Sequence, residues 1–451
     1  MKLTIIGTGY VGLVTGTCFA ELGHQVICLD NDMEKITKLK AGQIPIYEPG
    51  LEELFVRNTK AGRLQFTGDF KSAIEPSEVI FITVGTPDKG NGEADLLAIE
   101  TVTQKIGLLI NDYKLVVEKS TVPVETGKWI EQTIRTNNRN GVHFEVASNP
   151  EFLREGSAVE DFMHPDRVVI GVESPRAEKI LRELYSPFSA PMIATDIKSA
   201  ELIKHASNSF LATKISFINA IANLCERVGA DVEKVAEAVG LDHRIGKHFL
   251  NAGLGFGGSC FPKDLAAFIR LAEKVGYDFK LLKAVEEINR EQRRLVTRKI
   301  ESALWIIEGK TVGILGLAFK PGTDDLRNAP CLEVIEFLLQ EGAKVKAYDP
   351  QAMEKAKKIF PQLNYCSDPY EVAQESDCLV LVTEWDEFKK LQFSTLKTLM
   401  KQPILVDARN LYNPLEMVQL GFNYIGIGRK QSSPPKNNRM AEWVKPLYNT
   451  L

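Results

Sequence analysis

The stretch LGFGGSCFPKD, Leu254–Asp264, places a single cysteine among residues that could make it reactive. A Gly-Gly pair lets the backbone turn sharply, so the thiol of Cys260 can project into a cleft instead of a core. Pro262 suits the start of a helix, and either the helix N-terminus or Lys263 would stabilise a thiolate. We therefore expect Cys260 to be a nucleophile at neutral pH, with Asp264 orienting a nearby base or water. From these residues alone, a packed structural thiol remains the alternative.

A second chemical pattern opens the chain, where the glycines of GTGYVG follow an apolar strand and begin a helix. Gly7 permits the tight turn, Gly9 lets the backbone approach a pyrophosphate, and Gly12 allows close packing of the helix on the sheet. The helix N-terminus adds unpaired N–H donors. Asp30 ends the next apolar strand, where its carboxylate can bond ribose hydroxyls and repel a 2'-phosphate. These residues predict NAD over NADP, a preference that the nearby Lys35 weakens slightly.

The turn at 313–319, GILGLAF, lacks the three-glycine spacing and is not expected to hold a second NAD. The chain continues as FKPGTDDLR, in which Lys320 and Arg327 could meet phosphates. These residues favour a nucleotide-bearing substrate. Solvated loop charges explain the same two residues equally well from this stretch alone.

Between Thr195 and Val228, apolar residues recur near the period of 3.6, which predicts one long helix. Lys204 and Asn208 are spaced i, i+4 on one face of it, so both side chains can reach one substrate oxygen. On pattern alone, a surface lysine with a packed stem is the commoner case for Lys204. At 1.5 Å per residue the helix could reach roughly 50 Å, enough to join two domains and to offer a face to a second subunit.

Short apolar runs at 3–7, 25–30, 78–84 and 114–118 alternate with helical patterns, as in a doubly wound parallel sheet. The same order of runs returns between 310 and 410, which suggests a second sheet of the same kind. We therefore predict an α/β fold. Two Rossmann-like doubly wound parallel-sheet domains would be joined by a central helical region with one long helix.

The composition limits the class of protein. With 451 residues, 44% of them hydrophobic and 25% charged, the chain can form two or three well-packed domains. A net charge of -4 without a dense Lys/Arg cluster argues against a nucleic-acid partner. No apolar run approaches the roughly 20 residues of a membrane span and no secretory signal is present, so we expect no membrane partner and a cytoplasmic location. Cysteines without a C-x-x-C pair argue against a disulfide framework and against a metal site.

Eight ordered strings make the chain resemble the UDP-glucose/GDP-mannose dehydrogenase family over nearly its whole length. They are GTGYVG (7–12), VGTP (84–87), KSTVP (119–123), NPEFLREG (149–156), HPDRVVIG (164–171), AELIKHASNSFLATKISFIN (200–219), GFGGSCFPKD (255–264) and GLAFKPGTDDLR (316–327). The resemblance implies a four-electron oxidation of the C6 hydroxymethyl of a nucleotide sugar to a carboxylate, with two NAD+ and one water consumed. Cys260 would hold the aldehyde as a thiohemiacetal and then as a thioester, which water cleaves.

The resemblance also implies roles for other residues. Lys204 and Asn208 would contact the sugar, with Lys204 stabilising the developing oxyanion, and Asp264 would help position a water or the lysine as base. Glu151 would be an acid or base for the thiol steps. Thr121 would orient a water. The further cofactor contacts implied by the resemblance or by the GTGYVG turn are Tyr10, Val11, Thr86, Thr121, Glu155, Lys263 and Arg327. The implied substrate contacts are Glu151, Phe152, Leu153, Arg154, Glu155, Lys204, Asn208, Arg244, Phe249, Asn251, Gly257, Lys320 and Arg409.

The pattern of apolar runs and the resemblance together suggest how the chain is divided. Residues 1–195 are expected to form the N-terminal NAD-binding Rossmann domain, and residues 196–309 a central helical region for dimerisation that carries Cys260. Residues 310–430 would bind the UDP sugar in a second Rossmann-like domain, and 431–451 would be a polar tail. Arg244 matches a residue that reaches the substrate of a neighbouring subunit, which implies a homodimer through the long helix.

The substrate and the reaction leave alternatives. The string GGSC, instead of a GGHC-like string, favours UDP-glucose over N-acetylated sugars, with GDP-mannose or another nucleotide sugar as the alternative. A two-electron dehydrogenase of the 3-hydroxy-acid type would share the NAD domain and long helix, but it would have no task for Cys260. A silent module that only binds NAD and a nucleotide sugar is the remaining possibility.

Overall fold

A computed structural model describes residues 1–429, so the expected polar tail lies outside the described residues. The chain divides into two compact units. The N-terminal unit comprises Met1–Ala212, Ser259–Lys283 and Gly322–Asp324. The C-terminal unit comprises Thr213–Gly258, Ala284–Pro321 and the chain from Asp325 onward.

An eight-stranded sheet forms the centre of the N-terminal unit, in the order β3-β2-β1-β4-β5-β6-β7-β8. Neighbouring strands are parallel except β6 and β7, which pair antiparallel. Their order reverses between β1 and β4, the point in such sheets where ligands bind beyond the carboxyl ends of the strands. The strands are β1 (Lys2–Ile6), β2 (Gln25–Leu29), β3 (Leu64–Thr67), β4 (Val79–Ile82), β5 (Lys114–Glu118), β6 (Phe144–Ser148), β7 (Val168–Gly171) and β8 (Met192–Thr195).

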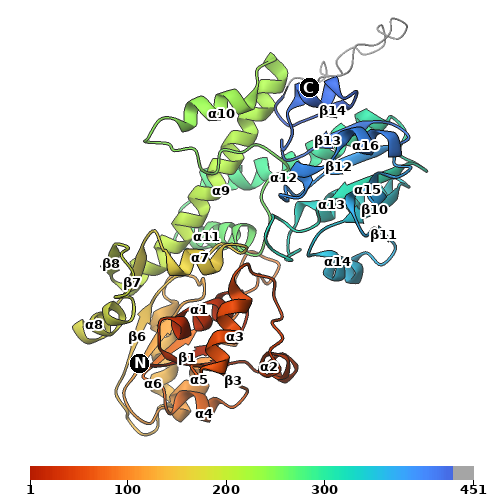
Figure 1. Ribbon diagram of the computed structural model, residues 1–451. Coiled ribbons are helices and arrows are strands. Elements are labelled where there is room, and N and C mark those ends of the chain that lie inside the picture. Colours follow the sequence, from red (N-terminus) through yellow and green to blue (C-terminus); the bar gives the residue numbers. More distant parts are fainter. Residues whose placement is uncertain (430–451) are drawn as a thin grey trace, which may run out of the picture. The chain divides into compact units, whose positions relative to one another are not determined.

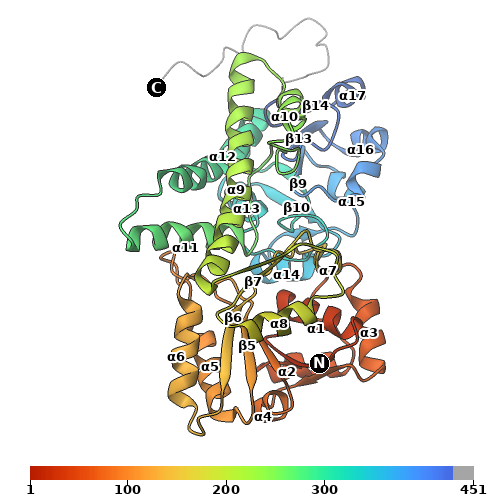
Figure 2. The ribbon, with the colours of Figure 1, turned by 90° about the vertical axis from the view of Figure 1, so that its left-hand side faces the viewer.

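Helices cover both faces of this sheet, as Figures 1 and 2 show, because alternate residues of each strand face opposite sides. In β1, Leu3 and Ile5 enter one apolar core and Ile6 enters the other. The unit's helices are α1 (Tyr10–Glu21), α2 (Met33–Lys40), α3 (Leu51–Lys60), α4 (Phe70–Ile74), α5 (Leu97–Leu109), α6 (Thr126–Asn137), α7 (Ala158–Met163), α8 (Pro175–Leu184) and α11 (Phe261–Lys274).

The predicted long helix is α9, Ile197–Val228, with 32 residues and hence a length of about 48 Å. It belongs to the N-terminal unit up to Ala212 and to the C-terminal unit from Thr213. A second long helix, α12 (Lys280–Leu304), ends just before Trp305, whose φ of +62° cannot continue a helix.

The C-terminal unit contains a six-stranded parallel sheet in the order β11-β10-β9-β12-β13-β14. Numbered within the unit, this order is 3-2-1-4-5-6, the same as for the first six strands of the other sheet. The strands are β9 (Thr311–Leu315), β10 (Lys344–Tyr348), β11 (Asn364–Tyr365), β12 (Cys378–Leu381), β13 (Ile404–Asp407) and β14 (Asn423–Ile425). The helices are α10 (Val232–Gly240), α13 (Pro330–Gln340), α14 (Met353–Ile359), α15 (Pro369–Ala373), α16 (Phe393–Leu399) and α17 (Pro414–Gln419), with a short 3-10 turn at Phe388–Lys390.

Candidate active site

The glycines after β1 have the geometry that a dinucleotide turn needs. Gly7 has φ +103°, and a Cβ there would lie 2.9 Å from the carbonyl oxygen of Thr83. A Cβ on Gly12 would lie 1.8 Å from the carbonyl oxygen of Gly7, so only glycine lets α1 start so close to the strand. At Gly9, by contrast, a Cβ would meet nothing within 4 Å. The open side of Gly9, at the N-terminus of α1, therefore fits a pyrophosphate.

Asp30 already has several donors around its carboxylate. Its oxygens accept the backbone N–H and the hydroxyl of Thr8 at 2.8 and 2.6 Å, and the N–H of Asp32 at 3.0 Å. Lys35 adds an ion pair at 3.0 Å. Burial alone would raise the pKa of Asp30, but these hydrogen bonds outweigh it and the pKa is lowered. Asp30 is thus ionised, and Lys35 neutralises it.

Five of the six predicted catalytic residues lie together in the N-terminal unit. Nζ of Lys204 is 2.9 Å from Oε1 of Glu151, and both side chains are buried. Nδ2 of Asn208 donates to Oδ2 of Asp264 at 2.6 Å, and the N–H of Asp264 donates to the carbonyl oxygen of Cys260 at 2.8 Å. The i, i+4 spacing on α9 directs Lys204 and Asn208 to these two carboxylates.

The thiol of Cys260 is not activated as the sequence suggested. Burial, followed by the nearby carboxylates of Glu151 and Asp264, raises its pKa to about 11, and Lys204 offsets this only in part. Cys260 is the N-cap of α11. This pKa favours the protonated thiol at neutral pH, in contrast to the expected thiolate, and such a thiol loses its proton as it attacks.

Buried groups of both charges surround the thiol of Cys260. Burial alone would lower the pKa of Lys204, but Glu151, Cys260 and Asp264 outweigh it and the pKa is raised. Burial alone would raise the pKa of Asp264, but Lys263, Lys204 and His205 outweigh it and the pKa is lowered. A buried ammonium and a buried carboxylate thus flank the sulfur.

Except for Arg327, the predicted cofactor residues outside the glycine turn also belong to the N-terminal unit. Oγ1 of Thr86 donates to the carbonyl oxygen of Thr121 at 2.8 Å, and Nζ of Lys263 lies 3.3 Å from Oγ1 of Thr86. Glu155 accepts a hydrogen bond from Ser259 at 3.1 Å, and the hydroxyl of Ser259 is 3.6 Å from Sγ of Cys260. The loops after β4, β5 and β6 are therefore linked to the start of α11.

Sequence reasoning missed several residues of this neighbourhood. Nζ of Lys119 donates to Oδ1 of Asn149 at 3.0 Å and ties the two loops together. The hydroxyl of Tyr10 bonds to Asp324 and lies 3.2 Å from Oγ1 of Thr323. Lys119 and Asn149 stand inside quoted motifs, which was a usable signal. Thr323 and Asp324 also stand inside a quoted motif, but nothing in the sequence paired them with Tyr10.

The other predicted substrate residues divide between the units. The guanidinium carbon of Arg167 lies 3.8 Å from the centroid of the Phe152 ring, and Arg154 forms an ion pair with Asp161. In the C-terminal unit, Arg244 pairs with Asp242. The N-terminal unit also contains Leu153, and the C-terminal unit also contains Phe249, Asn251, Gly257 and Lys320.

Two arginines of the C-terminal unit are engaged within that unit. Nε of Arg409 donates to the carbonyl oxygen of Val382 at 2.7 Å, and its NH1 donates to that of Gly255 at 3.2 Å. Arg327 pairs with Asp325 at 2.7 Å. A phosphate at either arginine would have to compete with these partners.

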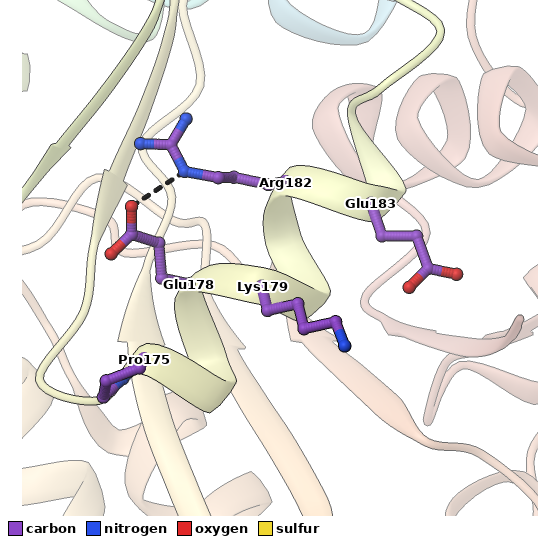
Figure 3. A pocket seen from close by; sticks show the side chains of 5 residues that line it. All are labelled: Pro175, Glu178, Lys179, Arg182 and Glu183. Carbon is purple, nitrogen blue, oxygen red and sulfur yellow. Dashed lines mark hydrogen bonds and ion pairs between the residues drawn. The ribbon is translucent and has the colours of Figure 1, made fainter.

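The surface hollows do not mark the expected chemistry. One of about 520 Å³ lies along a single face of α8, where Arg182 is bonded to Glu178, as Figure 3 shows. Another, of about 440 Å³, is lined by α5, α6, α11 and the chain near Gly92. Among residues 1–429, no group of three His, Cys, Asp or Glu side chains could hold a metal. No helix within the same residues is long and apolar enough to cross a membrane.

Comparisons with known proteins match the whole chain. Three models of the UDP-glucose/GDP-mannose dehydrogenase family match in order: the NAD binding domain at 1–189, the central domain at 198–291 and the UDP binding domain at 313–414. UDP-glucose 6-dehydrogenase TuaD of Bacillus subtilis (strain 168) is 52% identical over 429 residues, 95% of this chain and 93% of that one. UDP-glucose 6-dehydrogenase of Rhizobium meliloti (strain 1021) is 49% identical over 436 residues, 95% and 100% of the two chains.

A solved structure agrees with these relatives. The UDP-glucose dehydrogenase of the archaeon Pyrobaculum islandicum superimposes with a TM-score of 0.89 at 41% identity, covering 95% of this chain and 98% of that one. The predicted fold class, family and cofactor are confirmed. The chain belongs to the UDP-glucose/GDP-mannose dehydrogenase family, and it is an oxidoreductase with an NAD-binding domain at its N-terminus.

Proposed function

We propose that this enzyme oxidises C6 of UDP-glucose to UDP-glucuronate, with two NAD+ and one water consumed. Its similarity to relatives named UDP-glucose 6-dehydrogenase supports the choice of substrate. The observation that carries the proposal is the half-buried Cys260 together with the buried side chains of Lys204, Asn208, Asp264 and Glu151. A single hydride transfer would not need a cysteine in this set.

We further propose that residues 1–195 bind NAD, 196–309 carry Cys260 and the dimer face, and 310–430 bind the UDP moiety. The open side of Gly9 and the carboxylate of Asp30 fit the pyrophosphate and a ribose, respectively. When bound, NAD+ accepts a hydride from C6 in each of the two oxidations.

In the first oxidation, the protein must stabilise an alkoxide at C6 and remove its proton. The Lys204 ammonium is fixed by Glu151 and supplies the positive charge next to the developing oxyanion. Asp264, held ionised by Lys263 and Lys204, receives the proton directly or through a water that Asn208 helps to place.

The aldehyde is then trapped by Cys260. Its Sγ bonds to C6 as the thiol proton passes to the carboxylate of Glu151, which then gives this proton to the new oxyanion to form a thiohemiacetal. Loss of a second hydride and the hydroxyl proton gives the thioester. Water, oriented by Thr121, adds to this carbonyl, and the sulfur leaves as the thiol when it regains a proton. A thiol that is protonated before substrate binds suits this order of steps, because Glu151 accepts the thiol proton only as Sγ attacks the aldehyde.

The dimer proposal depends on one stripe of α9. Phe210, Phe217 and Leu224 recur every seventh residue on one helix face and are 66%, 51% and 54% exposed. An apolar stripe of this kind is typical of a helix that packs on a partner helix. Sedimentation of the wild type and of Phe210→Lys/Phe217→Lys would distinguish dimer from monomer, and a monomeric wild type would contradict the proposal.

The function is tested by stoichiometry. With UDP-glucose limiting, we expect two NADH per sugar consumed, and slower or no reduction with GDP-mannose, UDP-galactose and UDP-N-acetylhexosamines. One NADH per sugar would support a two-electron dehydrogenase. No NADH with any of these sugars would support a binding module, and a preference for GDP-mannose would support the alternative substrate.

A further inference from the structure

The loop between β5 and α6, which carries Thr121, is attached to α9 immediately after that threonine. Nε2 of His205 lies 2.7 Å from the carbonyl oxygen of Val122. Burial lowers the pKa of His205, so the ring is neutral at neutral pH and its Nε2 carries the hydrogen that it donates. The backbone next to Thr121 is therefore held by a side chain of α9.

Glu201 makes the second attachment, at the N-terminus of α6. Its two carboxylate oxygens accept the N–H groups of Glu125 and Gly127, each at 2.7 Å. A Cβ on Gly127 would lie 2.5 Å from Cγ2 of Ile197, so α6 begins in direct contact with α9. A negative charge at this helix end is also favoured by the helix dipole.

Four polar residues share this face of α9 with the reacting groups. Glu201, Lys204, His205 and Asn208 follow the spacing i, i+3, i+4, i+7, which places them on one side of the helix. They are 2%, 4%, 2% and 7% exposed. Glu201 and His205 hold the loop, whereas Lys204 and Asn208 hold the carboxylates beside Cys260.

The charges around Glu201 are compatible with this attachment. Burial raises the pKa of Glu201, and the two N–H donors offset part of this rise. The resulting pKa is about 6, so the group is ionised at neutral pH. Glu118, at the end of β5, is buried, and burial and then Glu201 raise its pKa well above the ordinary value. This shift favours the protonated form of Glu118, which reduces its repulsion of the Glu201 carboxylate. Lys198 pairs instead with the exposed side chain of Glu125, at 2.9 Å.

We propose that Glu201 and His205 are positioning residues, which hold the Thr121 loop in a fixed position relative to Lys204 on the same helix face. The inference rests on the proposed function. In that function, Thr121 acts in thioester hydrolysis, while Lys204 acts in the oxidations. Loosening the loop should therefore slow hydrolysis more than hydride transfer, and the Cys260 adduct should accumulate.

Glu201→Gln tests the inference in the full-length enzyme. An amide offers one acceptor oxygen instead of two, so one of the two N–H bonds is lost. We expect kcat to fall by about tenfold with little change in KM for UDP-glucose. Intact-mass measurement of acid-quenched turnover should show more covalent sugar adduct than in the wild type. Hydrogen exchange of the peptide 119–130 should accelerate.

Matched variants separate positioning from general damage. Glu131→Gln also removes a carboxylate, but from the outer face of α6 where Glu131 pairs with Arg135, and it should behave as wild type. His205→Gln keeps a donor near the Nε2 position and should retain more activity than His205→Leu. If Glu201→Gln does not fold, the two His205 variants still test the loop.

Three outcomes would overturn the inference. They are unchanged exchange and adduct level in Glu201→Gln, equal rates for His205→Gln and His205→Leu, or a fall in kcat without adduct. A wild type that makes no NADH would instead refute the proposed function, and the exchange measurement would still report on the loop.

Discussion

The turns after β1 and β9 occupy the same place in two sheets of the same strand order, but only the first has the geometry of a dinucleotide-binding turn. Each begins with a glycine of positive φ, Gly7 at +103° and Gly316 at +92°, packed against a threonine that follows the neighbouring strand. In the first turn the next glycine is open to a ligand, and α1 starts at once, at Tyr10. In the second turn Ala318 takes that place, and α13 starts only at Pro330.

The acidic residue that follows each turn shows the same divergence. Asp349 accepts N–H groups from Leu317, Ala318, Gln351 and Ala352 and the indole N–H of Trp385, all between 2.7 and 3.0 Å. It is 0% exposed, whereas Asp30 is 8% exposed. A carboxylate with five donors holds its own loop together. The strand order therefore sets where a turn lies, but the residues at the turn decide whether it can take a dinucleotide.

The largest expected effect contrasts the thiols of the two units. Cys260→Ala should lower turnover by at least about 1,000-fold, because no group then holds the aldehyde for the second oxidation. Cys331→Ser, at a buried cysteine of the C-terminal unit whose Sγ bonds the carbonyl oxygen of Leu317, serves as the control. NADH production measures both. Equal losses in the two variants would mean that stability, and not chemistry, is being measured.

The second contrast substitutes one residue in each turn, a glycine by alanine in the first and an alanine by glycine in the second. Gly12→Ala places a methyl group against the carbonyl oxygen of Gly7, so NAD affinity should fall by at least about 100-fold and the unit should melt earlier. Ala318→Gly should leave NAD affinity unchanged. Calorimetric titration and thermal unfolding supply the measurements, and tight NAD binding by the Gly12 variant would contradict the assigned turn.

A third contrast compares the two aspartates. Asp30→Asn should weaken NAD binding by about tenfold with a small effect on unfolding. Asp349→Asn should cost about 2–4 kcal/mol of unfolding free energy, because the new amide turns a donor toward other donors. Urea unfolding and NAD titration of both variants would show whether Asp30→Asn mainly weakens NAD binding while Asp349→Asn mainly lowers the unfolding free energy. Loss of stability in both alike would remove the distinction.

The smallest effect concerns the thiol itself. Alkylation of Cys260 in the unliganded enzyme should rise with pH toward a midpoint near 11. Because the Glu151 carboxylate raises the thiol pKa, Glu151→Gln should lower this midpoint. Rates of iodoacetamide modification, followed by peptide mass, measure it. A midpoint already below neutrality would restore the thiolate that the sequence suggested.

Much of the fold followed from apolar periodicity. The runs at 3–7, 25–30, 78–84 and 114–118 became β1, β2, β4 and β5, and the long periodic segment became α9. Strands β3, β6, β7 and β8 were not among these runs. In β3 and β6 a polar residue, Gln65 and Glu145, interrupts the apolar pattern. In β8 the two central residues, including Ile193, are exposed and so carry no alternating pattern.

The sequence by itself determined which residue types were available, since GTGYVG, the i, i+4 pair on α9 and the string around Cys260 can be recognised without coordinates. Only the tertiary structure decided their partners and their charge. Glu151 reaches Lys204, Glu201 reaches the α6 N-terminus, and Asp349 meets Trp385 across long separations in the chain. The ionisation of a buried group depends on such neighbours and on its distance from water, and neither is written in local sequence.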